Sequence, residues 1–192
     1  MPLVSLSQPS PNAWLDAVLA AFNEFLIDHA ANERKASAMA MSLVAHYPDR
    51  QELVTRMIDL ALEEMNHFRQ VVRLLQERGL VMAADEKDPY VNQLRSHVRK
   101  SRDEYFLDRL LSGAVIEARG EERFLLIAEN LQDARLTKFY STLARSEQGH
   151  HRLFLELAHL YFPASTVEAR LTDWIAIEAS VMQSLPIRSR LH

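Results

Sequence analysis

Two short stretches of this sequence, Glu64-Met-Asn-His67 and Glu147-Gln-Gly-His150, each place a glutamate three residues before a histidine. In a helix, residues three apart lie one turn along the same face, so each pair presents a carboxylate and an imidazole together. One such pair arises often by chance and is better interpreted as a polar pair on a metal-free helix. Two copies are a stronger signal, and Arg69 and Arg152 each follow the glutamate by five residues. The repeat predicts two related helical segments.

Each copy is preceded by one more glutamate at a matching distance. Glu33 lies 31 residues before Glu64, and Glu117 lies 30 residues before Glu147. At a rise of about 1.5 Å per residue, the two glutamates of each pair reach nearly the same height above the turn that joins their helices. The chain therefore resembles two helical hairpins repeated at a spacing of 83 or 84 residues.

The composition favours helices throughout. The 192 residues include four glycines and no cysteine, and short alternating runs typical of strands are missing. Without cysteine, disulfides, iron–sulfur clusters and thiol nucleophiles are excluded. A net charge of −4 gives no general attraction to nucleic acid. No run resembles a membrane span, and the N-terminus lacks the features of a secretory signal. We expect a cytoplasmic protein with no membrane partner.

Turn residues divide the chain into helices. They are expected over about 11–45, 49–78, 90–100, 103–130, 133–161 and 166–184. Short turns make the first two helices, and those at 103–130 and 133–161, antiparallel neighbours, and the long connection between these hairpins is typical of ferritin-like folds. We therefore predict an all-α, ferritin-like four-helix bundle of two antiparallel hairpins with one long crossover. It is expected to be a single domain over 1–192, with its core at about 11–162, an additional C-terminal helix and a loose tail.

In each of the four long helices, a candidate metal ligand interrupts an apolar stripe that faces the predicted core. On the second helix this stripe is Leu53, Met57, Leu60, Glu64, His67, Val71 and Leu74. Four carboxylates buried together would repel, and burying one unpaired charge already costs several kcal/mol. Two divalent cations balance the four negative charges. One Glu from each of two helices and Glu-x-x-His from the other two are the ligands of di-iron and di-manganese bundles.

We therefore predict two iron ions, with manganese as an alternative, and carboxylates that bridge them from Glu64 and Glu147. Positions on the metals should remain open for dioxygen. The predicted metal ligands, through which catalysis would run, are Glu33, Glu64, His67, Glu117, Glu147 and His150.

Other polar residues near these ligands compete for the same assignment. Glu63, Glu121 and Glu122 lie off the stripes and are interpreted as solvated faces. His29 is on the stripe, one turn before Glu33, and is expected to support that ligand or fill the core. The remaining histidines are expected at the surface or its boundary: His46, His97, His151 and His159.

Small residues flank two of the ligands. Gly113 and Gly120 lie one turn on either side of Glu117, and Ala36 and Ala40 follow Glu33. Glycine inside a helix costs about 0.5–1 kcal/mol relative to alanine, so its presence needs a reason. A substrate cavity beside the metals and close packing of helices are both consistent with this pattern.

Four segments surround the candidate ligands: Asp28-His-Ala-Ala-Asn-Glu33-Arg-Lys-Ala, Glu63-Glu-Met-Asn-His67-Phe, Ile116-Glu-Ala-Arg-Gly-Glu-Glu-Arg-Phe124 and Ser146-Glu-Gln-Gly-His150. They resemble the family of bacterial tRNA hydroxylases that act on 2-methylthio-N6-isopentenyladenosine. The resemblance covers about residues 10–185.

The resemblance implies a di-iron, dioxygen-dependent monooxygenase that hydroxylates the isopentenyl group of this nucleoside in tRNA. It also implies a separate electron-transfer protein as the source of reducing equivalents. A small-molecule oxygenase such as a quinone hydroxylase, or an iron-oxidising storage protein, would use a similar bundle and stays open as an alternative. The oligomeric state stays open as well.

A basic run in the crossover is the first candidate for contact with tRNA phosphates. It consists of Arg95, Arg99, Lys100 and Arg102, with no acidic residue between them. Binding through these residues would weaken with salt. A basic solvated helix face is the alternative interpretation. Weaker candidates are Arg34, Lys35, Arg188 and Arg190.

Overall fold

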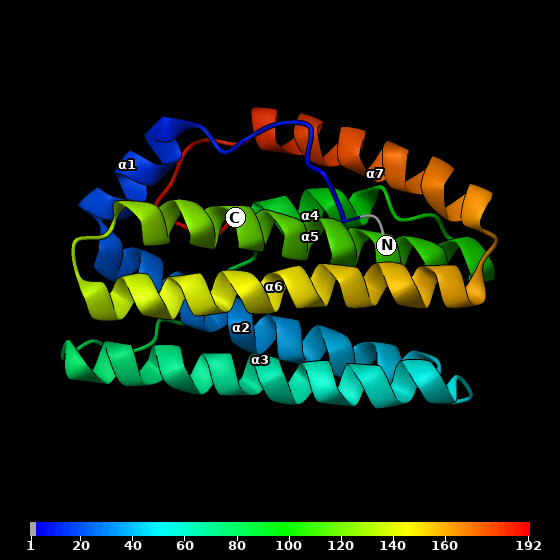
Figure 1. Ribbon diagram of the computed structural model, residues 1–192, viewed down its shortest axis with the longest axis horizontal. Coiled ribbons are helices and arrows are strands. Elements are labelled where there is room, and N and C mark those ends of the chain that lie inside the picture. Colours follow the sequence, from blue (N-terminus) through cyan, green and yellow to red (C-terminus); the bar gives the residue numbers. More distant parts are fainter. Residues whose placement is uncertain (1–2) are drawn as a thin grey trace. The chain divides into compact units, whose positions relative to one another are not determined.

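The computed structural model describes residues 3–192, which form seven α-helices and no strand (Figure 1). The prediction of an all-α protein is confirmed for this part of the chain. The helices are α1 (Asn12–Ala20), α2 (Phe22–His46), α3 (Gln51–Glu77), α4 (Pro89–Ser96), α5 (Arg102–Asn130), α6 (Ala134–Tyr161) and α7 (Ala164–Ser184).

The chain divides into two compact units. The α2–α3 unit comprises Asp16–Glu86 and Arg188–Leu191. The α5–α6 unit comprises the N-terminal segment up to Leu15, Lys87–Ile187 and His192. Each unit contains one of the two predicted hairpins, and the single-domain organisation over 1–192 stays a prediction.

The hairpin of the α2–α3 unit forms as expected (Figure 1). All seven residues of the predicted stripe on α3 are buried. The helix ends at Glu77, and Gly79, two residues later, has a φ of +67°, the left-handed conformation that glycine adopts without strain. The Gly79 and Leu80 amides donate to the carbonyls of Gln76 and Leu75, which satisfies the last turn of the helix.

The predicted helix over 11–45 is wrong at one point, because the chain breaks at Ala21 into α1 and α2. Ala21 has φ −129° and ψ 49°, and its carbonyl accepts a hydrogen bond of 3.0 Å from the Ser189 hydroxyl. On α1, just before the break, Leu19 is exposed while Val18 is buried. Neither proline nor glycine marks this position, and the partner lies 168 residues away.

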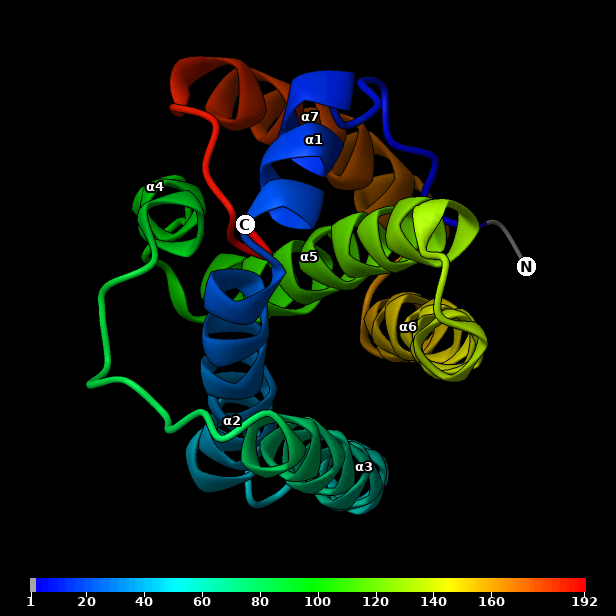
Figure 2. The ribbon, with the colours of Figure 1, turned by 90° about the vertical axis from the view of Figure 1, so that its left-hand side faces the viewer.

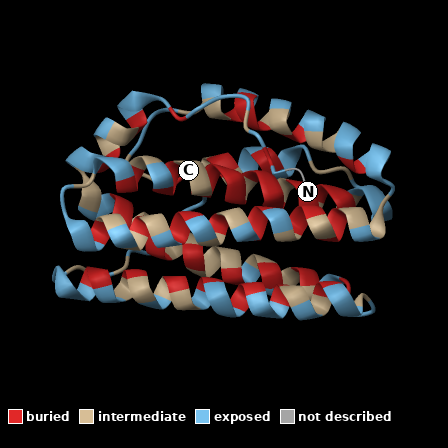
Figure 3. Cartoon of the chain, viewed as in Figure 1, coloured by how far each residue is buried: buried red, intermediate tan, exposed pale blue. Residues whose placement is uncertain are grey.

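In the α5–α6 unit, α5 is surrounded by α4, α6 and α7 (Figure 2). Buried residues therefore occur on most faces of α5 (Figure 3), in contrast to the single stripe predicted for it. The turn to α6 ends at Asp133, whose side chain caps that helix by accepting from the amides of Arg135 and Leu136.

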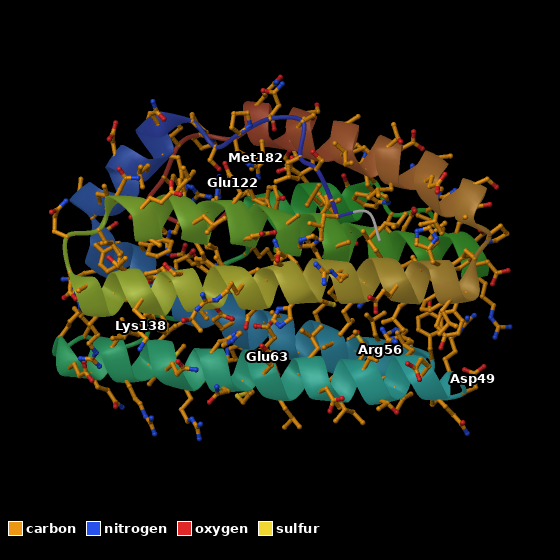
Figure 4. The ribbon with its side chains drawn as sticks, viewed as in Figure 1. Asp49, Arg56, Glu63, Glu122, Lys138 and Met182 are labelled. Carbon is orange, nitrogen blue, oxygen red and sulfur yellow. The ribbon has the colours of Figure 1, made fainter. Side chains whose placement is uncertain are left out.

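The face of α5 that packs on α7 carries buried charges. Arg119 donates to Glu178 at 2.8 Å and 3.0 Å, and the Tyr90 hydroxyl donates to the same carboxylate. Glu122, labelled with Met182 in Figure 4, lies on this side and accepts from the amide and hydroxyl of Ser10 at 2.7 Å. The interpretation of Glu122 as a solvated face is therefore wrong.

Asp108 forms a second buried polar cluster on α5. Its carboxylate accepts from the backbone amide and guanidinium of Arg99, from the guanidinium of Arg170, and from the indole of Trp174. Burial alone would raise the pKa of Asp108, but these hydrogen bonds lower it to about 2. The ion pair with Arg170 links α5 to α7.

The C-terminal tail is held in place, so the expectation of a loose tail is wrong. The Leu191 amide donates to Asp28 at 2.8 Å, and Arg190 pairs with Asp28 and Glu86. Leu191 is buried. These contacts involve residues distant in sequence, which local composition does not reveal.

Replacing Asp108 with asparagine should lower the free energy of unfolding by about 3 kcal/mol at pH 7. This is the lower end of the range for breaking a buried ion pair, because Arg99 stays partly in water. The ordinary pKa of the carboxyl is 3.8 and the folded value is about 2. The difference between wild type and variant should therefore be full above about pH 4 and shrink as the pH falls toward 2.

Urea unfolding at a series of pH values measures this difference. Asp103→Asn is the matched control, because Asp103 is exposed on the same helix, and it should change stability by no more than about 0.5 kcal/mol. A pH-independent difference would contradict the assignment to the Asp108 charge.

Candidate metal centre

In the α2–α3 unit, three of the predicted ligands converge. One ligand atom from each of Glu33, Glu64 and His67 lies within 4.8 Å of the other two. His67 Nδ1 is 3.4 Å from Glu64 Oε2 and 3.7 Å from Glu33 Oε2. All three residues are buried. The Glu64 and His67 side chains come from consecutive turns of α3, and Glu33 comes from α2.

Glu33, Glu64 and His67 form one half-site, in which burial and neighbouring charges shift the pKa values in opposite directions. Burial alone would raise the pKa of Glu33, but hydrogen bonds from His29 and His67 hold that pKa well below its usual range. Burial would lower the pKa of His67, yet hydrogen bonds and charge interactions with Glu33 and Glu64 raise it to about 10. The two carboxylates thus strongly favour a positive charge between them, and a divalent cation meets the same demand.

His29 supports Glu33, as expected. Its Nε2 lies 2.6 Å from Glu33 Oε1, one turn along α2, and both side chains are buried. Glu63, labelled in Figure 4, is 47% exposed and lies 3.9 Å from His67 Nε2. Its interpretation as a solvated residue is confirmed.

In the α5–α6 unit, the other three predicted ligands also converge. One ligand atom from each of Glu117, Glu147 and His150 lies within 4.8 Å of the other two, and all three residues are buried. His150 Nδ1 is 3.5 Å from Glu147 Oε2. Each unit therefore holds two buried carboxylates and one imidazole. This set of oxygen and nitrogen donors fits iron or manganese.

The contact between His151 and Glu121, beside this second half-site, was not predicted from the sequence. His151 is fully buried and its Nε2 lies 2.9 Å from Glu121 Oε2, so the expectations of a surface histidine and a solvated Glu121 are wrong. Burial is the main cause of a lowered pKa for His151. Gln148 donates to the other oxygen of Glu121 at 2.9 Å. The sequence did offer one signal for the two residues on α6: Gln148 and His151 each directly follow a predicted ligand.

The small residues near the ligands differ in their surroundings. A Cβ on Gly113 would lie 3.1 Å from the ring of Phe154, which favours close packing at this position. A Cβ on Gly120 would lie 3.6 Å from the Glu147 carboxylate. Ala40 is buried and Ala36 is partly exposed. A cavity lined by these residues stays a prediction.

The basic residues proposed for tRNA contact also separate into two groups. Arg99 pairs with Asp108 and Glu104, so its charge is largely neutralised within the protein. Arg95, Lys100 and Arg102 are exposed. Among the weaker candidates, Arg34 pairs with Asp85, Lys35 donates to the carbonyl of Glu86, and Arg190 pairs with Asp28 and Glu86.

A family model described as tRNA-(MS2IO6A)-hydroxylase (MiaE) matches residues 3–192. The chain belongs to this family. Two curated relatives carry the name tRNA 2-(methylsulfanyl)-N(6)-isopentenyladenosine(37) hydroxylase. The relative from Pseudomonas putida is 38% identical over 97% of this chain and 91% of its own length. The relative from Salmonella typhimurium is 34% identical over 76% of this chain and 53% of its own length.

A solved structure is also similar to this MiaE-family chain. It is titled "Protein 43 with aldehyde deformylating oxygenase activity from Synechococcus" and matches with a TM-score of 0.93 at 32% identity. The match covers 97% of this chain and 94% of the other. This likeness confirms the prediction of a ferritin-like fold. Within the part of the chain that the structure describes, no helix combines the length and hydropathy needed to span a bilayer.

Replacing Gly113 with leucine should lower the free energy of unfolding by about 1–3 kcal/mol, because the side chain would overlap the Phe154 ring. Thermal unfolding followed by circular dichroism measures the effect. Gly149→Ala is the control, since a Cβ on Gly149 meets nothing within 4 Å, and it should raise stability by about 0.5–1 kcal/mol. A Gly113→Leu protein as stable as wild type would instead indicate open space beside Glu117.

Proposed function

We propose that the two half-sites together bind two iron ions and that the protein uses them, with dioxygen, to hydroxylate the isopentenyl group of 2-methylthio-N6-isopentenyladenosine in tRNA. The main support for the proposal is that the two half-sites have the same composition. In each unit, two buried glutamates and one buried histidine lie close together. Membership of the family supplies the substrate.

The charge of the six ligands favours two divalent cations. Four carboxylates contribute four negative charges, and burying them without compensation would cost several kcal/mol each. One Glu from each of two helices and Glu-x-x-His from the other two match the di-iron and di-manganese ligand set of helical bundles. When bound, the iron ions supply the open positions and the redox chemistry with which dioxygen is reduced.

The overall reaction balances with two electrons and two protons. One oxygen atom enters a C–H bond of the isopentenyl group, and the other leaves as water. A separate electron-transfer protein is the proposed source of the electrons, and manganese is the alternative metal. We propose a cytoplasmic location because the substrate is tRNA.

The residues around the half-sites orient the ligands and keep water away. His29 donates to Glu33 and fixes one carboxylate oxygen. A Cβ at Gly120 would lie 3.6 Å from the Glu147 carboxylate, so this position of α5 packs beside that ligand. Glu64 and Glu147 are buried, and each carboxylate would hold a metal ion in its own half-site. Held in this way, the ligands need little rearrangement when metal binds.

Exposed basic residues in and beside the crossover remain candidates for contact with tRNA phosphates. Arg95, Lys100 and Arg102 are exposed, whereas Arg99 is already paired. We propose that the three exposed residues strengthen tRNA binding in a salt-dependent manner.

A small-molecule oxygenase is the second candidate function. It is favoured by the solved structure whose title names aldehyde deformylating oxygenase activity. The same ligands would serve that reaction, so the substrate distinguishes the two functions.

A single-turnover reaction tests the tRNA substrate. Reduced, iron-loaded protein is mixed with dioxygen and tRNA that carries 2-methylthio-N6-isopentenyladenosine, and the nucleosides are analysed by mass spectrometry. We expect a gain of one oxygen on the isopentenyl group. Glu117→Ala should reduce this product at least about 100-fold, because it removes a ligand. Glu129→Ala, an exposed change on the same helix, should leave it unchanged.

Two results would contradict the proposal in different ways. Iron binding without oxygen transfer to tRNA, but with turnover of an aldehyde, would favour the second candidate. Oxygen transfer to tRNA that survives in Glu117→Ala would contradict the assigned ligand.

A further inference from the structure

We infer that Glu121 is a positioning residue of the metal centre: its carboxylate fixes α5 against α6 and so holds Glu117 beside Glu147 and His150. The role toward metal rests on the proposed function. The contacts that suggest it lie within the α5–α6 unit and involve no metal ligand directly.

The carboxylate of Glu121 makes one contact with each of two residues on α6. Its Oε1 accepts from Gln148 Nε2 at 2.9 Å, and its Oε2 lies 2.9 Å from His151 Nε2. Gln148 directly follows Glu147, and His151 directly follows His150. One carboxylate is therefore connected to the chain next to both ligands of α6.

On its own helix, Glu121 lies one turn after Glu117. The same side chain thus connects the α5 turn of Glu117 with the α6 turn of Glu147 and His150. Two hydrogen bonds accepted by one carboxylate restrict both sliding and rotation of the helices relative to each other. Gly120, next to Glu121, lies at the same level of α5, where a Cβ would be in ordinary van der Waals contact with the Glu147 carboxylate at 3.6 Å.

The contact with Glu121 determines which ring nitrogen of His151 carries the proton. The imidazole is fully buried, and its Nδ1 has no hydrogen-bond partner among residues 3–192. A neutral ring that donates from Nε2–H to Glu121 leaves only an acceptor lone pair unused. The other neutral tautomer would bury an N–H without an acceptor and turn the Nε2 lone pair toward a carboxylate. Glu121 therefore selects one tautomer and one ring orientation.

The equivalent position in the other hairpin also joins two helices. Ser37 lies four residues after Glu33, as Glu121 lies four after Glu117. The buried Ser37 hydroxyl donates to the carbonyl of Ala61 at 2.8 Å and links α2 to α3. The same position in both hairpins thus connects the helix of the single glutamate to the helix of the Glu-x-x-His pair, through different chemistry.

Loss of such a contact should be visible in metal binding. Groups that orient metal ligands typically affect metal affinity by about 10–100-fold when they are removed. An interhelical hydrogen bond that only stabilises the fold would lower the melting temperature and leave the affinity of the folded protein unchanged. The two roles are therefore distinguished by the affinity and by the spectrum of the bound metal.

Anaerobic titration of the full chain with Co²⁺ tests the inference. Binding is followed through the visible d–d absorption, whose intensity reports the coordination geometry. We expect Glu121→Ala to weaken binding of one of two Co²⁺ ions about 10–100-fold and to change the spectrum. Glu121→Gln keeps one acceptor oxygen and should show a smaller loss. Glu129→Ala should match wild type in affinity and spectrum.

Failure of the positioning role and failure of the metal centre would give different results in this titration. If wild type binds two Co²⁺ ions and both Glu121 variants match it within about twofold, with the same spectrum, the positioning role is overturned and the metal centre stands. If wild type binds no Co²⁺, the proposed centre fails and the positioning role fails with it. If Glu121→Ala does not fold, Glu121→Gln decides by the same two measurements.

Discussion

The burial of like charges is the physical constraint on which much of this chain depends. Each hairpin buries two glutamates and one histidine beside each other. In the α2–α3 unit, the response is visible in His67, whose pKa rises to about 10, and in the short contact from His29 to Glu33. Burying several carboxylates close together costs free energy unless positive charge compensates them. Their presence in both hairpins is explained if cations bind there.

The burial of charge also affects the face of α5 that packs on α7. Because α5 is covered by α4, α6 and α7, its polar residues away from the ligands are buried as well. Asp108 and Arg119 are each matched by an oppositely charged partner on α7, Arg170 and Glu178. These pairs connect the extra C-terminal helix to the helix that carries Glu117. That helix is consequently restrained on both of its sides, by α7 and by the Glu121 contacts to α6.

The repeat in the sequence predicted that three candidate ligands come together in each hairpin, because it encodes both spacing and helical face. Glu64 and His67 lie on a stripe whose seven members are all buried. Features that depend on distant partners were not predictable: the break at Ala21 involves Ser189, and the tail is held through Asp28. Glu121 and His151 lie off the predicted stripes, and only the packed helices bring them together.

We propose that the six residues of the two half-sites bind two metal ions. Anomalous diffraction at the iron edge, from crystals of the reduced, iron-loaded protein, tests it most directly. We expect two ordered iron ions, bound by Glu33, Glu64, His67, Glu117, Glu147 and His150. Crystals with no ordered iron, or with iron bound by other residues, would contradict it.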